Sequence, residues 1–342
     1  MQPVEPHPRR GRTTALGRGG ALIGCVLNVC CSSPESKHEA PNAPRASRET
    51  EDARAADAGE DWSYGVCPDT DAIGHFTLLL ADDYTGFQGS VADAVLPSDV
   101  LRVVAEAGDC KLLERPIWSC DACDVATQTC AMTGCVPFPK NQDVGRVVVA
   151  GLVAPLQMQP SAHLTYTNPP NFPHPGFEPN APIALDASGG ALPSFTLHGV
   201  GVKPLRSSTP GVHLKRESAA KIEWQVQALP PAVADRIGVV LLLTVNRHGS
   251  SAGWIRCESA DDGSLEIPST LIDGLFDRGL SGWPTLELRR QSSETVQLGT
   301  GCVDFAVRSS TTFDVSVEGL TSCNTSDDCP SGQSCSADLS CQ

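Results

Sequence analysis

Short apolar segments separated by turn residues dominate the chain beyond residue 62, and amphipathic helices of useful length are missing from the pattern. Such short strands, bounded by Gly, Pro, Asp and Asn, are typical of β-sandwiches and barrels. The predicted fold is mainly β, with two β-sandwich-like domains at residues 63–208 and 209–320. The predicted strands are His75–Leu80, Val144–Leu152, His163–Thr167, Pro182–Asp186, Phe195–Val202, Ile222–Val226, Ile237–Val245 and Gly253–Ser259.

Three less regular segments receive more specific predictions. Ser98–Glu106 is expected to form one short helix with Ser98 as its N-cap. Leu265–Leu275 predicts a strand followed by a helical turn. Cys302–Val307 and Thr312–Val317 predict a hairpin that turns at Ser309 and Ser310. An early strand tryptophan followed by two cysteines resembles the immunoglobulin-like sandwich, and this likeness concerns architecture alone.

The N-terminal residues 1–31 have the layout of a secretory leader. A basic stretch precedes the short apolar run Ala21–Val29, which is too short to span a bilayer. Leu22–Cys25 resembles a bacterial lipobox, so Cys25 is the candidate lipidation site. Cleavage at Cys30 or Cys31, or a plain cleaved signal, are the alternatives. Residues 32–62 lack apolar periodicity and predict a disordered tether.

Fifteen cysteines indicate an oxidising compartment, because cytosolic proteins rarely carry so many. Without the three of the leader, twelve remain, an even number that predicts complete pairing. We expect Cys257 to pair with Cys302, by elimination. The other candidates for disulfides are Cys67, Cys110, Cys120, Cys123, Cys130, Cys135, Cys323, Cys329, Cys335 and Cys341.

Two cysteine-rich segments, an insert at residues 120–135 and a tail at 321–342, have similar local sequences and predict two copies of one stapled module. Four cysteines allow three pairings, and the sequence does not choose among them. Zinc is not expected, because only Cys120 and Cys123 have the CxxC spacing of a structural zinc site. The net charge of -15 argues against nucleic acid as a partner.

Gly249–Gly253 (GSSAG) fits the pattern of a serine-hydrolase nucleophile elbow, which makes Ser251 a candidate catalytic residue. The elbow requires a helix directly after the serine, whereas Gly253–Ser259 predicts a strand. The family also requires a later histidine, and His248 is the last in the chain. A hairpin loop accounts for the same residues, so a catalytic Ser251 remains only the alternative.

Two classes of ligand are considered from side-chain type alone. Pairs of aspartates could bind calcium, although they also suit turns; these are Asp69 with Asp71, Asp82 with Asp83, Asp261 with Asp262, and Asp327 with Asp328. No cofactor is otherwise expected. Exposed aromatic side chains could stack on sugars, and the candidates are Trp62, Trp118, Trp254, Trp283, Tyr84 and Phe87.

The tail segment Asp327–Cys335 has some likeness to the core of whey-acidic-type inhibitors, over about half of that family's cysteines. The leader, the tether, Gly108–Cys110 (GDC), the insert and Gly253–Ser264 (GWIRCESADDGS) together resemble uncharacterised cysteine-rich lipoproteins of complex Gram-negative bacteria. That resemblance implies no known activity. We expect an exported, lipid-anchored envelope protein that binds a protein or carbohydrate, or has a structural role; a secreted hydrolase or an inhibitor-like effector is the alternative.

Overall fold

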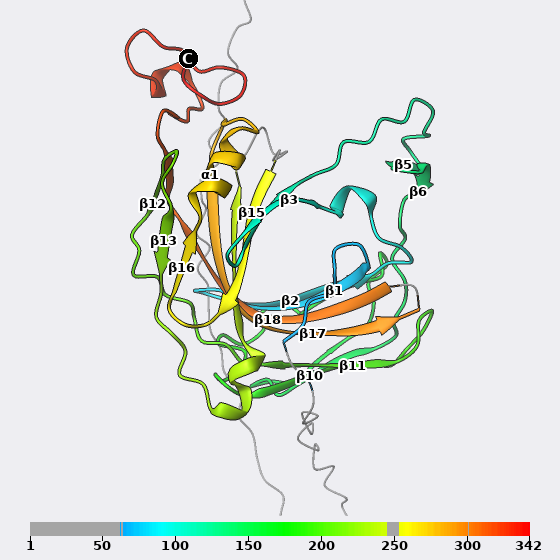
Figure 1. Cartoon of the computed structure of the whole chain (residues 1–342). Helices are drawn as coiled ribbons and strands as arrows, with labels where there is room; N and C mark the ends of the chain where they lie inside the picture. Colours follow the sequence, from blue (N-terminus) through cyan, green and yellow to red (C-terminus); the bar gives the residue numbers. More distant parts are fainter. Residues whose placement is uncertain (1–61, 63, 245–252, 300) are drawn as a thin grey trace, which may run out of the picture. The chain divides into compact units, whose positions relative to one another are not determined.

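The computed structural model describes residue 62 and residues 64–244, 253–299 and 301–342 (Figure 1). The mainly β fold predicted from the sequence is confirmed, because strands make up 45% and helices 7% of the structure. Ser269–Phe276, labelled α1, is the one α-helix of the described residues. Three short 3-10 turns are η1 (Pro97–Asp99), η2 (Pro231–Arg236) and η3 (Ser326–Asp328).

A nine-stranded mixed sheet is the largest element (Figure 1). Most neighbouring strands run antiparallel, while β1 and β18 run parallel. The strands, in their order across the sheet, are β3 (Arg102–Ala107), β4 (Cys110–Glu114), β15 (Gly253–Ala260), β14 (Gly238–Thr244), β17 (Thr285–Leu298), β18 (Gly301–Phe313), β1 (Ala72–Leu80), β2 (Thr85–Val91) and β9 (Thr165–Thr167).

A four-stranded sheet packs on the half of the large sheet that contains β1, β2 and the middle of β18. Phe76 and Phe305 of the large sheet bury their rings in the same hydrophobic core as Leu185 and Leu197 of the smaller sheet. Figure 1 shows β10 and β11 running beneath β17 and β18. The strands, in order, are β11 (Phe195–Val200), β10 (Pro182–Ala187), β7 (Val147–Ala150) and β8 (Leu156–Met158).

A second hydrophobic core lies on the other half of the large sheet, against β14, β15 and the start of β17. Leu241, Ile255 and Leu288 are fully buried there with Ile267 and Ile272, which belong to the covering layer. This layer consists of α1 and two strand pairs. The pairs are β12 (Val212–Leu214) with β19 (Val315–Val317), and β13 (Ala220–Glu223) with β16 (Ser264–Ile267).

The two cores correspond to two sandwich-like halves, but a single sheet contributes to both. β4 precedes residue 208 in the chain and yet pairs with β15 in the second half. β18 lies in the predicted second domain and yet pairs with β1 of the first. The predicted boundary between residues 63–208 and 209–320 therefore does not separate two sheets.

A buried ion pair joins the strands near the meeting point of the two halves. The Arg290 Nε donates to Asp261 Oδ2 at 2.7 Å, and both side chains are 1% exposed. Arg290 also donates to the carbonyl oxygens of Lys203 and Gln225, which lie in the segments between the two cores. Trp224 Nε1 donates to the other oxygen of Asp261 at 2.7 Å. Asp261 and Arg290 thus satisfy each other inside the fold.

All twelve cysteines beyond the leader form disulfides, but the predicted Cys257–Cys302 pair is wrong. Cys110 and Cys257 are direct partners across β4 and β15, whereas Cys302 is the second residue of β18 and lies beside Ala72 at the start of β1. The strands that carry Cys257 and Cys302, β15 and β18, are separated in the sheet by β14 and β17. The distance along the sequence does not reveal this order. The pairs are Cys67–Cys302, Cys110–Cys257, Cys120–Cys130, Cys123–Cys135, Cys323–Cys335 and Cys329–Cys341.

The insert and the tail share one disulfide connectivity, first to third and second to fourth cysteine. In the insert, the hairpin of β5 (Gln128–Ala131) and β6 (Gly134–Pro137) places Cys130 directly opposite Cys135. In the tail, Thr325 and Asp328 form a reciprocal cap around η3. The prediction of two similar stapled modules is consistent with this connectivity.

Two predictions of secondary structure are wrong. Ser98–Glu106 is not a helix, because η1 ends at Asp99 and β3 then pairs with β4 as the edge of the large sheet. Cys302–Val317 is not a hairpin either, because β18 continues through Ser309 to Phe313 alongside β17. The Ser309 hydroxyl is buried and accepts a hydrogen bond from the Leu205 amide at 3.1 Å, which a turn residue would not do.

Candidate functional site

Cys25, the candidate lipidation site, and Ser251, the candidate nucleophile, both lie outside the described residues. The described flanks still bear on the Ser251 motif. β14 ends at Thr244 and β15 begins at Gly253, and the two strands pair antiparallel along their length. A strand, and not a helix, therefore follows the motif, as the sequence predicts and as a nucleophile elbow does not allow.

The predicted calcium carboxylates are partly engaged in other contacts. Asp261 binds Arg290 and Trp224 in the interior, so its oxygens face no solvent. Asp69 lies 3.3 Å from the Arg256 guanidinium. Asp328 accepts backbone hydrogen bonds from Asn324 and Thr325 in the cap of η3. These contacts leave Asp261 without a free ligand atom for a cation.

The aromatic candidates for sugar stacking are distributed between the core and the surface. Phe87 is 3% exposed and Trp62 is 9% exposed, so neither offers a platform to a sugar. The Trp62 ring instead stacks on His198 at 6.4 Å between ring centroids. The Arg115 guanidinium covers the ring of Trp254. The exposed aromatic candidates are Tyr84, Trp118 and Trp283.

The face of the nine-stranded sheet opposite the two cores carries polar side chains, and we call it the open face. Side chains alternate along each strand, so in β17 the buried core residues Leu288 and Arg290 alternate with Arg289 and Gln291 on the open face. Neighbouring strands add further polar groups to it. The open face comprises His75, Thr77, Arg256, Glu258, Glu287, Arg289, Gln291, Ser293, Asp304 and Arg308.

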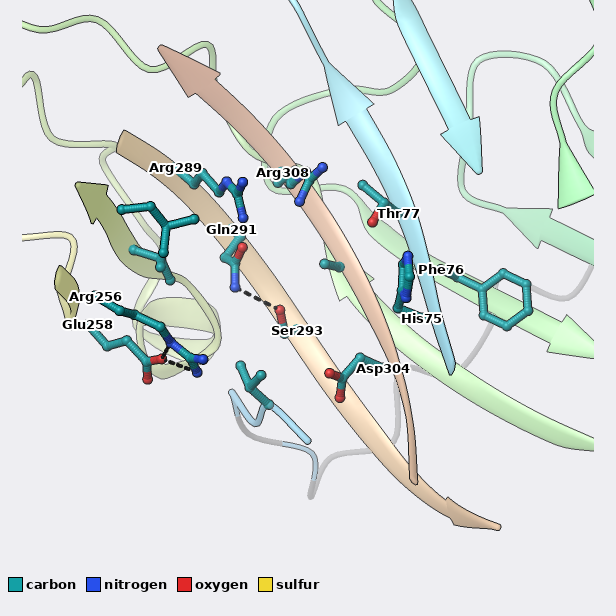
Figure 2. A pocket seen from close by; sticks show the side chains of 14 residues that line it. His75, Phe76, Thr77, Arg256, Glu258, Arg289, Gln291, Ser293, Asp304 and Arg308 are labelled. Carbon is teal, nitrogen blue, oxygen red and sulfur yellow. Dashed lines mark hydrogen bonds and ion pairs between the residues drawn. The ribbon is translucent and has the colours of Figure 1, made fainter. Parts of the chain in front are cut away.

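Two adjoining cavities hollow the open face, and together we call them the trough. The first, of about 240 Å³, lies over β1, β17 and β18 and is lined by the side chains in Figure 2. The second, of about 480 Å³, lies beside Lys111 and Leu113 of β4. Arg256 and Glu258 line both cavities and so mark where they meet. A ligand in the trough would contact strands from both halves of the fold.

The Arg256 guanidinium is neutralised within the protein. Its Nη2 lies 2.6 Å from Glu258 Oε1 and its Nη1 lies 3.3 Å from Asp69 Oδ1. Burial alone would lower the pKa of Arg256, but the charges of Glu258 and Asp69 outweigh burial and raise that pKa above its ordinary value. Arg256 is therefore a charged wall of the trough with its own counter-ions.

Arg289 and Arg308 differ from Arg256 because their donors are incompletely used. Arg289 Nη2 donates to Glu287 Oε2 at 2.6 Å, while its buried Nε has no hydrogen-bond partner. The Nε of Arg308 is also buried without a partner, and no other nitrogen of Arg308 bonds to any described residue. Burial, and next the charge of Arg289, lower the pKa of Arg308. Figure 2 shows the two side chains next to each other at one end of the first cavity.

His75 and Asp304 face each other across β1 and β18 at the other end of this cavity (Figure 2). Asp304 accepts hydrogen bonds from the Cys67 amide, at 2.8 Å, and from Thr295, while burial raises its pKa. Burial, and then Arg308, lower the pKa of His75. Across the described part of the chain, no hydrogen bond connects His75 to Asp304 or to Ser293. In this geometry, His75, Asp304 and Ser293 are not joined into a hydrogen-bonded triad.

No protein-family model matches the chain, and no curated protein matches it. Among solved structures, the FN1–FN3 domains of chicken CNTN1 align at 8% identity and a TM-score of 0.17, over 63% of this chain and 66% of that chain. A tetra-tandem repeat from the extending region of a large adhesion protein aligns at 11% identity and a TM-score of 0.15, over 74% and 78%. TM-scores this low establish no shared arrangement, so neither likeness bears on function.

The trough is not apparent from the sequence pattern. Arg289 and Arg308 are separated by the long β17–β18 hairpin, and only the strand register brings them together. The open-face residues of β17 do alternate with its core positions. They are Glu287, Arg289, Gln291, Ser293 and Thr295. This period of two was the available signal, but three core positions of β17 are polar and concealed it: Arg290, Ser292 and Glu294.

Proposed function

We propose that this chain is an exported, non-enzymatic binding protein that holds its ligand in the trough on the open face. The observation that carries the proposal is the trough itself, a hollow of about 240 Å³ and 480 Å³ in its two parts, lined by charged side chains from both halves of the fold among apolar ones. Pockets with a few convergent polar groups are the default binding sites of proteins.

Six disulfides support the part of the proposal that concerns location, since such bonds persist in oxidising compartments. No helix among the described residues is long and apolar enough to cross a membrane. We propose attachment through lipid on Cys25, with residues 32–61 as the tether; the predicted tether is one residue shorter because Trp62 is buried in the first core. Mass spectrometry of the native protein tests this directly: a diacylglyceryl mass on Cys25 is expected, and an unmodified N-terminus elsewhere would refute it.

Binding in the trough can be tested by filling it. Ala306 lies on the open face and lines the first cavity, so Ala306→Trp introduces a bulky ring there. Ala191→Trp, in the exposed connection between β10 and β11, is the matched control. Glycan and peptide arrays should give ligands that bind the parent and the control but not Ala306→Trp, while thermal denaturation shows all three folded. Ligands that bind all three equally would contradict the proposal.

The hydrolase and effector alternatives make different predictions. A fluorophosphonate probe that labels the parent, but not Ser251→Ala, would replace the binding proposal with a hydrolase. Deletion of the tail, residues 321–342, should leave array binding intact, because no tail residue lines the trough. Loss of binding in the folded deletion variant would assign the function to the tail module.

A further inference from the structure

We infer that Arg308, with Arg289 beside it, binds the carboxylate group of an organic ligand in the first cavity of the trough. The inference deepens the proposed function and rests on it, because it names the chemical class that the trough recognises. The ligand contributes one carboxylate, and the rest of it contacts the apolar walls of the cavity at Val240, Leu242 and Ala306.

Strand register places the two arginines side by side. Arg289 of β17 pairs with Ser310 of β18, and Gln291 pairs with Arg308. Arg308 is thus the diagonal neighbour of Arg289 on the same face of an antiparallel pair, a separation within reach of long side chains. Both guanidinium groups line the first cavity, as Figure 2 shows.

Arg289 and Arg308 have N–H donors without an acceptor in the described part of the chain. The buried Nε atoms of Arg289 and Arg308 lack partners, and the nearby Glu287 carboxylate is already bonded to Arg289. A buried donor without a partner costs about 1–3 kcal/mol, and more when it is charged. The donors that an acceptor from outside the chain would meet are the terminal nitrogens of Arg308, which bond to no described residue and belong to a side chain that lines the cavity.

Charge and shape together select a carboxylate. The two guanidinium groups and Glu287 leave one net positive charge, which a monoanion neutralises and a doubly charged phosphate exceeds. The planar fork of Arg308 matches the two oxygens of a carboxylate. Arg256 with Glu258 and Asp69 adds one net negative charge, which lies where the two cavities meet and not at the arginine pair. Asp304, at the opposite end of the cavity, is bonded to Cys67 and Thr295.

Carboxylate binding can be measured with small probes on the oxidised full-length chain at low ionic strength. Sodium acetate, D-glucuronate and N-acetylglycine are titrated while the midpoint of thermal denaturation is followed, because a ligand that binds only the folded state raises it. The last two probes distinguish a sugar acid from a peptide C-terminus as the source of the carboxylate. Sulfate and inorganic phosphate, at matched ionic strength, are the competing anions.

We expect saturable stabilisation by the carboxylates, weakened about tenfold or more in Arg308→Gln, as the loss of a charge-assisted contact predicts. Arg308→Lys keeps the charge without the fork and should bind with intermediate affinity. Arg146→Gln, which removes the same charge from an exposed residue before β7, should bind like the parent. Equal weakening in Arg308→Gln and Arg146→Gln, tighter binding of phosphate or sulfate, or no saturable stabilisation would each overturn the inference.

Two outcomes distinguish a failure of the carboxylate site from a failure of the proposed function. If an array ligand is lost in Ala306→Trp but keeps its affinity for Arg308→Gln, the carboxylate site is refuted and binding in the trough stands. If the carboxylates bind through Arg308 while no array ligand responds to Ala306→Trp, the carboxylate site stands and the proposed function fails.

Discussion

Arg290 and Arg308 lie on neighbouring strands of one sheet but on opposite faces, and their surroundings differ completely. Arg290 is 1% exposed, and its donors reach both oxygens of Asp261 and two backbone carbonyls. Arg308 is half-buried and bonds to no described residue. The core face therefore satisfies its buried charge within the chain, whereas the open face leaves donors for a partner from outside.

We expect the largest change in the free energy of unfolding from a substitution of Asp261. Asp261→Ala leaves the Arg290 guanidinium buried without a counter-ion and removes the acceptor of Trp224, so the free energy of unfolding should fall by about 3–5 kcal/mol. Urea denaturation measures this loss. The control is the exposed neighbour Asp262→Ala, which should stay within about 0.5 kcal/mol of the parent. Similar losses in both variants would show that the buried ion pair does not stabilise the fold.

A smaller effect of opposite sign is expected at Arg308. Arg308→Met replaces a half-buried charge that has no hydrogen-bonded partner by an apolar side chain of similar length, so the free energy of unfolding should rise by about 1 kcal/mol. Arg290→Met, made in the other face, should lower it. Urea denaturation of the two variants side by side decides the matter: if both lose stability, Arg308 has a partner within the fold and the contrast between the faces is wrong.

The apolar part of this fold could be predicted from the sequence, and the polar part could not. β1 and β14 were identified because their apolar residues are continuous or alternate. β17 was missed because its core positions include Arg290 and Ser292, whose burial depends on Asp261 and on the Val200 backbone, far away in the chain. Burial of polar residues follows from partners that only the tertiary fold supplies.

Dependence on the tertiary fold also explains why the predicted Cys257–Cys302 pair and the predicted hairpin were wrong. The pairing of Cys110 with Cys257 depends on β4 crossing to the second half, where no local pattern places it. The hairpin predicted at Ser309 was wrong because a buried serine that accepts a hydrogen bond from Leu205 resembles a turn serine in sequence. The arginine pair likewise depends on the register of β17 against β18, which the sequence pattern leaves open.

The smallest expected effect is the change of stability with pH that His75 causes. Burial and Arg308 lower the pKa of His75 in the folded protein, while Asp304 and Asp99 oppose that shift. Below pH about 6.5 the unfolded chain therefore takes up the proton first, and stability falls as the pH drops from there toward the folded pKa. Above pH about 7 the contribution of His75 is constant.

His75→Asn should remove this acid-dependent loss, so the stability of the variant relative to the parent should be higher at pH about 5 than at pH about 7.5. Thermal denaturation of the parent and the variant at both pH values measures the difference. Comparing the two proteins at the same pH removes the contribution of Asp304 and the other carboxylates, which both proteins contain. A gap between parent and variant that is the same at both pH values would mean that His75 titrates normally and is not buried beside Arg308.

The central claim, that the open face keeps Arg308 free for an external carboxylate while Arg290 is satisfied inside, can be observed at the atoms themselves. A ¹⁵N–¹H correlation spectrum of the arginine Nε–Hε groups, assigned with Arg308→Lys and Arg289→Lys, is recorded during a titration with sodium acetate. We predict saturable shifts of the Arg308 and Arg289 signals and a constant Arg290 signal. Arg308 and Arg289 signals that do not move, or that move in parallel with Arg290 and the surface arginines, would contradict the claim.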